Sequence, residues 1–147
     1  MIDGSTTKWY NQSSTPNNFS NGIRSIEYPS STKTCVIHLS SGSGWSSDFD
    51  HDIAFEFDVI SENCDILYVQ DCDENDVAKY TRYDDLVENN DHVLVKFLKD
   101  KTEIYVNNSA TPVRVNEYGV TLGNKSRIGL QGANGTLNFS NLIIYPI

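Results

Sequence analysis

The alternation of apolar and polar residues along the chain predicts β-strands. Residues 91–108 show it most clearly, because a run at 93–97 and a shorter run at 104–106 flank a polar break and both follow a period of two. These two runs predict a β-hairpin. Residues 135–147 are rich in apolar, β-forming side chains, so we expect them to form a strand laid into a sheet.

Residues 48–60 predict a long strand with two different faces. Positions of one parity are apolar, namely Phe49, Ile53, Phe55, Phe57 and Val59. Positions of the other parity are acidic, namely Asp48, Asp50, Asp52, Glu56 and Asp58. A strand of this kind places one face in the core and the other in solvent.

Turn residues divide the rest of the chain into short segments. Asn21-Gly22 precedes an alternating run at 23–28, and Asn134-Gly135 joins a run at 126–131 to the C-terminal strand, so both dipeptides predict hairpin turns. Further short strands are expected at 35–39, 65–71, 113–115 and 120–122. About ten short strands without a long helical period predict an all-β sandwich of two packed antiparallel sheets.

Size and charge narrow the choice of partners. A chain of 147 residues and 16.5 kDa has the length of one domain, so residues 1–147 are expected to form a single domain. The formal net charge of -9 would repel phosphate backbones, and no Lys or Arg cluster offsets it, which argues against nucleic acid. No apolar run approaches the roughly 20 residues that span a bilayer, so membrane insertion is not expected. The abrupt start at Met1 fits a domain cut from a longer surface or virion protein.

The cysteines do not predict a disulfide framework. Cys35, Cys64 and Cys72 are odd in number, so at least one has no partner within the chain. Cys64 and Cys72 flank the strand expected at 65–71, whose extended length exceeds the roughly 7 Å that a disulfide can bridge. This favours an intracellular, viral or archaeal setting over a eukaryotic secreted one.

Several core segments carry a resemblance to a known superfamily. They are Phe55–Val59, Val93–Phe97 with Ile104–Asn107, Arg127–Leu130 and Phe139–Tyr145. Their order across residues 48–147 resembles that of the concanavalin A-like lectin/glucanase superfamily, which includes laminin-G-like and carbohydrate-binding modules. The resemblance implies a jelly-roll sandwich that binds or cleaves glycans. It departs from the family at Asn107-Asn108, where related domains usually place Gly second, although Asn tolerates the left-handed conformation needed there.

Trp45 is the strongest candidate for ligand contact. It lies in a Gly/Ser-rich loop, where a large ring either packs back onto the core or offers its flat face to a sugar ring. The aspartates of the neighbouring strand could accept hydrogen bonds from sugar hydroxyls. The candidate ligand-binding set is Trp45, Asp48, Asp50, Asp52, Tyr80 and Tyr83.

A calcium site is a further hypothesis. Residues 71–76 begin like a calcium loop, with oxygen ligands at alternate positions. These candidate ligands are Asp71, Asp73 and Asn75. The EF-hand pattern then fails, because Asp76 replaces the turn glycine and Arg82 replaces the bidentate glutamate. A looser calcium site, formed by these residues or by the aspartates at 48–52, stays open, whereas the three separated histidines argue against zinc.

Glu56 and Glu62 raise the alternative of a glycoside hydrolase. The Glu-Phe-Asp sequence at 56–58 resembles the acidic motif of laminarinase-like glucanases. A retaining hydrolase needs two carboxyl groups about 5–5.5 Å apart, and Glu62 lies beyond that range on an extended strand. The simpler interpretation is an acidic, solvent-facing side of a sandwich strand, so we expect no enzymatic activity.

The leading hypothesis is therefore a non-catalytic, lectin-like module. It would recognise a cell-surface glycan or polysaccharide as part of an adhesin or of a phage or virus tail or spike protein. Its location would be the cell surface, the extracellular space or a virion, and its other partners would be subunits of that assembly. The rival hypothesis is a purely structural or interaction sandwich of a virion or surface protein.

Overall fold

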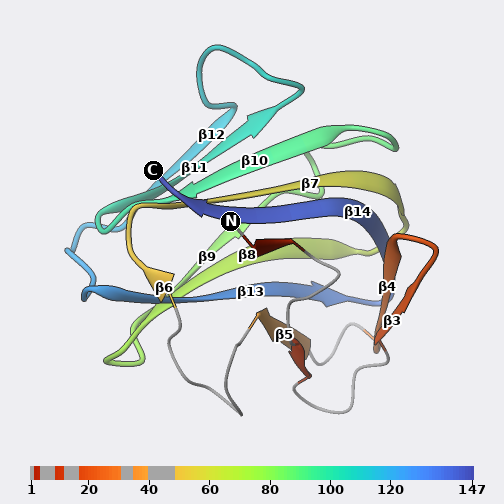
Figure 1. Ribbon diagram of the computed structural model, residues 1–147, viewed down its shortest axis with the longest axis horizontal. Coiled ribbons are helices and arrows are strands. Elements are labelled where there is room, and N and C mark those ends of the chain that lie inside the picture. Colours follow the sequence, from red (N-terminus) through yellow and green to blue (C-terminus); the bar gives the residue numbers. More distant parts are fainter. Residues whose placement is uncertain (1, 4–8, 12–16, 31–34, 40–48) are drawn as a thin grey trace.

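The computed structural model describes residues 2–3, 9–11, 17–30, 35–39 and 49–147, and these residues form strands, turns and loops without a helix (Figure 1). The strands are β1 (Ile2–Asp3), β2 (Trp9–Asn11), β3 (Asn17–Ser20), β4 (Ile23–Tyr28), β5 (Cys35–Leu39), β6 (Phe49–Asp50), β7 (Ile53–Glu62), β8 (Ile66–Asp73), β9 (Ala78–Arg82), β10 (His92–Phe97), β11 (Lys101–Val106), β12 (Arg114–Glu117), β13 (Lys125–Ala133) and β14 (Gly135–Pro146). Over these ranges no helix is long and apolar enough to cross a membrane.

The strands form two antiparallel sheets that pack on each other (Figure 1). The larger sheet has the order β12-β11-β10-β7-β14-β4-β3, with β1 paired to β14. The smaller sheet has the order β2-β5-β13-β8-β9, with β6 paired to β13. The predicted all-β sandwich is confirmed. Strand β12 is an edge strand of the larger sheet, and β9 is an edge strand of the smaller sheet.

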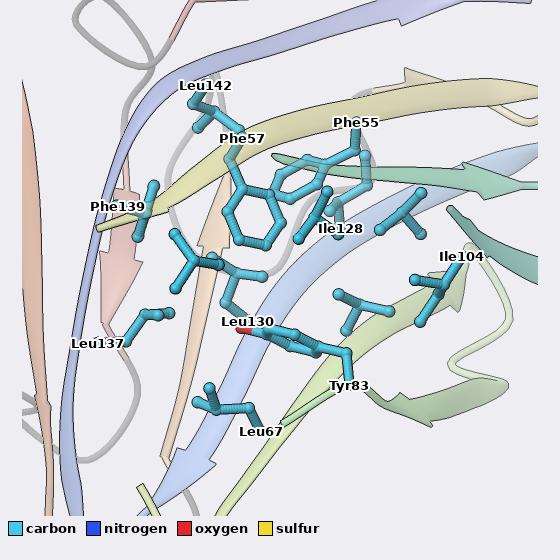
Figure 2. Close-up of a cluster of buried hydrophobic side chains, with 14 of the residues drawn as sticks. Phe55, Phe57, Leu67, Tyr83, Ile104, Ile128, Leu130, Leu137, Phe139 and Leu142 are labelled. Atoms are coloured by element: carbon cyan, nitrogen blue, oxygen red, sulfur yellow. The ribbon is translucent and has the colours of Figure 1, made fainter. Parts of the chain in front are cut away.

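The core lies between the two sheets, because alternate side chains of their strands point to the same side. Phe55 and Phe57 on β7 and Val93 and Val95 on β10 are all 0% exposed, and the register sets Phe57 opposite Val93. Figure 2 shows Phe55 and Phe57 of the larger sheet in one cluster with Leu67, Ile128 and Leu130 of the smaller sheet. The predicted burial of alternate residues in both segments is confirmed.

Two of the predicted turns are confirmed with their expected backbone. Strands β10 and β11 pair as the hairpin expected over 91–108, with Val95 opposite Ile104. Asn21 and Gly22 join β3 to β4 with φ angles of 54° and 78°. Two positive φ angles in a two-residue hairpin loop define the type I′ turn that Asn-Gly favours.

Asn134-Gly135 is not a hairpin turn, contrary to the sequence prediction. Strand β13 belongs to the smaller sheet and β14 to the larger one, so this dipeptide carries the chain from one sheet to the other. The crossing is tight. A Cβ at position 135 would lie 2.6 Å from Cα of Cys64 and 2.7 Å from the backbone oxygen of Asn63, so only glycine fits.

Residues 48–60 do not form one continuous strand either. The described part divides into β6 in the smaller sheet and β7 in the larger sheet. His51 and Asp52 make the crossing, and Asp52 adopts a left-handed φ of 62°. The acidic and apolar faces predicted for this segment therefore hold within β7 but do not continue through Asp50.

The segment 113–123 differs from the prediction in a similar way. The strand expected at 113–115 begins one residue later and runs through Glu117 as β12. Residues 120–122 form no strand, because the chain turns back there toward the β10–β11 loop. The Leu122 backbone N–H donates to the oxygen of Lys99 at 2.8 Å, and the Leu122 side chain is buried.

Candidate functional site

The predicted ligand-binding residues do not form one site. Trp45 and Asp48 lie outside the described residues. Asp50 is exposed on β6 and pairs with the Lys125 ammonium group at 2.6 Å, which lowers the pKa of Asp50. Asp52 is exposed in the crossing turn. Tyr80 lies on β9 with 43% of its surface exposed, and strands β13 and β8 of the smaller sheet separate β9 from β6.

Tyr83 is not a ligand platform, contrary to the sequence prediction. It is 0% exposed and its ring enters the core between the sheets, as Figure 2 shows. Its ring meets that of Phe57 edge to face at a centroid distance of 5.9 Å. Burial raises the pKa of its hydroxyl well above the ordinary value. The residue therefore stabilises the fold and does not contact a ligand.

The arrangement of Asp71, Asp73 and Asn75 does not favour the calcium hypothesis. Asp71 is 0% exposed, and both of its carboxylate oxygens already accept hydrogen bonds from protein side chains. The Asp73 carboxylate accepts the backbone N–H groups of Asn75 and Val77, each at 2.9 Å, and that of Gly123 at 2.8 Å. Most of the acceptor positions of these two carboxylates are therefore used within the protein, where they order a loop and a buried network.

Asp71 is the centre of a buried polar network that links the two sheets. His51 Nε2 lies 2.9 and 3.0 Å from the two Asp71 oxygens, and the Ser126 hydroxyl donates to the first of them at 2.9 Å. The Tyr118 hydroxyl donates to the second at 3.2 Å and is also bonded to the Thr102 hydroxyl. Ser126 belongs to the smaller sheet and Thr102 to the larger one. The network therefore fastens the two layers at this end of the sandwich.

The electrostatics of this network favour a charged histidine. Burial opposes the charge of His51, but the hydrogen bond and negative charge of Asp71, the Gly123 backbone and the charge of Asp73 together raise its pKa. Nδ1 of His51 is buried and makes no hydrogen bond of normal geometry with the described residues. The arrangement is not a Ser-His-Asp relay, because the serine donates to the aspartate and not to the histidine.

A metal centre is not supported within the described ranges. No three or more His, Cys, Asp or Glu side chains there are arranged to hold a metal ion. The cysteines Cys64 and Cys72 are both free thiols.

A second polar cluster lies on the outer face of the larger sheet. His92 on β10 lies opposite Asp58 on β7, and its Nδ1 is 2.6 Å from the Asp58 carboxylate while its Nε2 is 2.7 Å from that of Glu56. Tyr145 of β14 donates a hydrogen bond to Glu56, and Asn141 donates to Asp58 at 2.7 Å. A carboxylate at each ring nitrogen favours the doubly protonated, positively charged form of His92, which can donate from both.

This cluster does not support the glycosidase alternative through Glu56 and Glu62. The two residues lie six positions apart on β7, or about 20 Å along an extended strand, where a retaining hydrolase needs about 5–5.5 Å. Glu62 instead accepts the Cys64 backbone N–H at 2.9 Å. The acidic residues of β7 bind a histidine and a local turn.

The contacts of His92 with Asp58 and Glu56 predict that the stability of the fold depends on pH. Burial opposes its charge, but the hydrogen bonds and charges of Asp58 and Glu56 outweigh burial and raise the pKa above the ordinary 6.5. A raised folded-state pKa gives stabilisation that is complete below the unfolded value and is lost as the pH rises through the folded value. We expect His92→Gln to remove about 1 kcal/mol of stability at low pH and less at high pH. Urea denaturation midpoints of the wild type and of His92→Gln, measured from acidic to alkaline pH, test this expectation. If the two midpoints changed with pH in parallel, the charge of His92 would not contribute to stability.

A surface depression lined by aromatic, charged and amide-bearing residues lies where edge strands β9 and β12 of the two sheets meet. We call it the edge hollow. It has a volume of about 420 Å³, is open to solvent, and is lined by Tyr80, Thr81, Arg82, Asp85, Arg114, Val115 and Asn116. Strand β9 supplies Tyr80 and Arg82, which share one parity, and β12 supplies the residues from 114 onward.

Long side chains of β12 reach across to β9 and shape the hollow. Arg114 binds Asp85 with both terminal nitrogens at 2.8 and 2.9 Å and donates to the backbone oxygen of Arg82 at 3.0 Å. The Asn116 amide nitrogen donates to the backbone oxygen of Tyr80 and to the Thr81 hydroxyl, each at 3.0 Å. These contacts hold the lining of the hollow in place next to Tyr80, which is itself one of the lining residues.

Of the hollow, only Tyr80 could be proposed from the sequence. Arg114 and Asp85 lie 29 positions apart, and Asn116 and Tyr80 lie 36 apart. No local pattern indicates that β9 and β12 meet, because they belong to different sheets. The one available signal was a tyrosine on a short strand among polar residues.

Comparisons with known proteins address the fold. No protein-family model and no curated protein sequence matches the chain. Among solved structures, a sialidase aligns with a TM-score of 0.64 at 9% identity, over 94% of this chain and 17% of the sialidase. A functionally unknown protein from Saccharomyces cerevisiae aligns with a TM-score of 0.60 at 11% identity, over 97% of each chain. The botulinum neurotoxin serotype G binding domain aligns with a TM-score of 0.47 at 13% identity, over 97% of this chain and 44% of that one. The chain spans less than a fifth of the sialidase, and the first two likenesses concern the sandwich fold alone.

Proposed function

We propose that the chain is a non-catalytic carbohydrate-binding module that contacts a glycan at the edge hollow. The observation that carries this proposal is that Tyr80, which is 43% exposed, lines a depression together with Asn, Asp and Arg residues. A flat aromatic face next to fixed polar groups matches a sugar ring, which has apolar C–H faces and a hydroxyl-bearing edge.

The polar floor of the hollow supports the same proposal. Asn116 donates both amide hydrogens to β9, which leaves its carbonyl oxygen as an acceptor for a sugar hydroxyl. The bidentate pair of Arg114 with Asp85 keeps these side chains in one geometry, so little ordering is needed when a ligand binds. Tyr80 itself is held edge to face by Tyr68, with ring centroids 6.2 Å apart.

The wider role follows the same proposal. A glycan-binding sandwich of this size fits a cell-surface, extracellular or virion protein, such as an adhesin or a phage or virus tail or spike, in which neighbouring subunits would be its other partners.

The alternative of a structural or interaction domain is favoured by a different feature. Val113, Val115 and Val120, which lie just before, within and after β12, are 46%, 43% and 50% exposed, and such apolar groups suit a protein partner.

Substitution of Tyr80 tests the proposal. We expect Tyr80→Ala to weaken glycan binding about tenfold or more, since loss of an aromatic face costs about 1.4 kcal/mol. A glycan array followed by isothermal titration of the best ligand measures this. Phe19→Ala is the matched control, because Phe19 is 40% exposed but lies on β3 at the opposite edge of the larger sheet. Absence of any glycan binding, or equal binding by wild type and Tyr80→Ala, would leave the structural alternative ahead.

A further inference from the structure

The charged side chains of the edge hollow neutralise one another. Arg82 binds Asp84 through Nε at 2.9 Å and Nη2 at 2.8 Å. Arg114 binds Asp85 in the same two-pronged manner. The hydrogen bond and charge of Asp84 raise the pKa of Arg82, and the hydrogen bond with Arg114 lowers the pKa of Asp85. The hollow and its border thus contain two pairs of opposite charge, which sum to zero.

We propose that the edge hollow selects neutral saccharides over acidic ones, an inference that rests on the proposed glycan-binding function. An acidic sugar is bound tightly where a guanidinium group offers its fork to the sugar carboxylate. Here the forks of both arginines already hold aspartates. An incoming carboxylate would have to displace Asp84 or Asp85, and it would approach a chain with a net charge of -9.

A cationic ligand fares no better in the hollow. The carboxylates of Asp84 and Asp85 are each bonded by an arginine, so neither offers an unpaired negative charge. The uncharged residues that line the hollow include aromatic Tyr80, apolar Val115, and Asn116 with its oxygen acceptor. These groups are complementary to C–H faces and uncharged hydroxyls, which a neutral saccharide supplies.

The test compares matched neutral and acidic glycans. The probes are lactose-terminated oligosaccharides and the same oligosaccharides capped with sialic acid, titrated into the wild-type chain. We expect the neutral member of each pair to bind at least tenfold more tightly. An acidic member that binds as tightly, with binding lost in Tyr80→Ala, would overturn the neutral preference and leave the glycan-binding function standing. Absence of binding by both classes across a full glycan array would overturn the function and this inference together.

Charge-changing variants give a second, independent readout. Asp85→Asn leaves Arg114 without its compensating charge but keeps one oxygen acceptor for it. We expect the ratio of acidic to neutral affinity to rise about tenfold. Asp50→Asn is the matched control, since it changes the net charge equally on exposed β6, outside the lining of the hollow. Melting curves verify that both variants are folded. An equal shift in both variants, or no shift in Asp85→Asn, would show that the local pairing does not set the selectivity.

Discussion

Replacing Asp71 with alanine is expected to lower the free energy of unfolding by about 3–5 kcal/mol. The substitution removes the acceptor shared by His51, Ser126 and Tyr118, and it leaves buried donors without a partner. Because the side chains of His51 and Asp71 are both 0% exposed, water cannot replace the lost contacts. Chemical denaturation near pH 6 measures the change.

The pH dependence of this effect separates the charge from the packing. The raised pKa of His51 means that its pairing with Asp71 stabilises the fold fully below about pH 6.5 and progressively less as the pH rises through the folded-state value. The difference between wild type and Asp71→Ala should therefore shrink toward alkaline pH. Asp50→Ala is the control, because this exposed aspartate pairs with exposed Lys125 and its loss should barely change the midpoint. A variant as stable as the wild type near pH 6 would contradict the proposed buried ion pair.

The parts of the fold that could be predicted are those set by local chemistry. Alternation in 93–97 and 104–106 predicts both the strands and their inward faces, because successive side chains of a strand point to opposite sides. Asn21-Gly22 predicts its turn, because both residues adopt positive φ at low cost. Such features depend on a few neighbouring residues and carry over directly to the structure.

The choice between the two sheets could not be predicted from local chemistry. Asn134-Gly135 has the sequence of a hairpin turn, and the segment around His51 has the alternation of an unbroken strand. In both places the chain crosses to the opposite sheet. The crossing at Gly135 is fixed by the close approach of Asn63 and Cys64, which lie more than 70 positions earlier in the chain. A local pattern contains no information about a contact of that range.

The candidate site illustrates the same limit in side-chain terms. Acidic residues at alternate positions in 71–75 predict ligands, but on β8 the inward face carries Asp71 and Asp73 into a buried network and a loop. The sequence shows that these carboxylates share a face and does not show that the face is internal. Tyr80 and Tyr83 differ in exposure. Tyr80 lies within β9 and is 43% exposed, whereas Tyr83 follows the last residue of β9 and its side chain is buried.

Replacing Phe57 with alanine is expected to lower the free energy of unfolding by about 3–5 kcal/mol, through lost burial and the cavity left behind. Phe57 is 0% exposed, and its ring meets those of Phe55, Tyr83 and Phe139 at centroid distances of 5.3, 5.9 and 5.6 Å. These partners come from β7, β14 and the end of β9, so the truncation weakens the contact between the sheets as well as one strand.

Urea denaturation of Phe57→Ala, Phe57→Leu and Val115→Ala checks this expectation. Phe57→Leu should lose less, because a leucine still fills part of the space between the sheets. Val115→Ala should stay within about 0.5 kcal/mol of the wild type, since the valine is 43% exposed on edge strand β12. If Phe57→Ala were no more costly than Val115→Ala, the ring would not lie at the centre of the core. The conclusion that the apolar faces of β7 and β10 are buried between the two sheets would then be wrong.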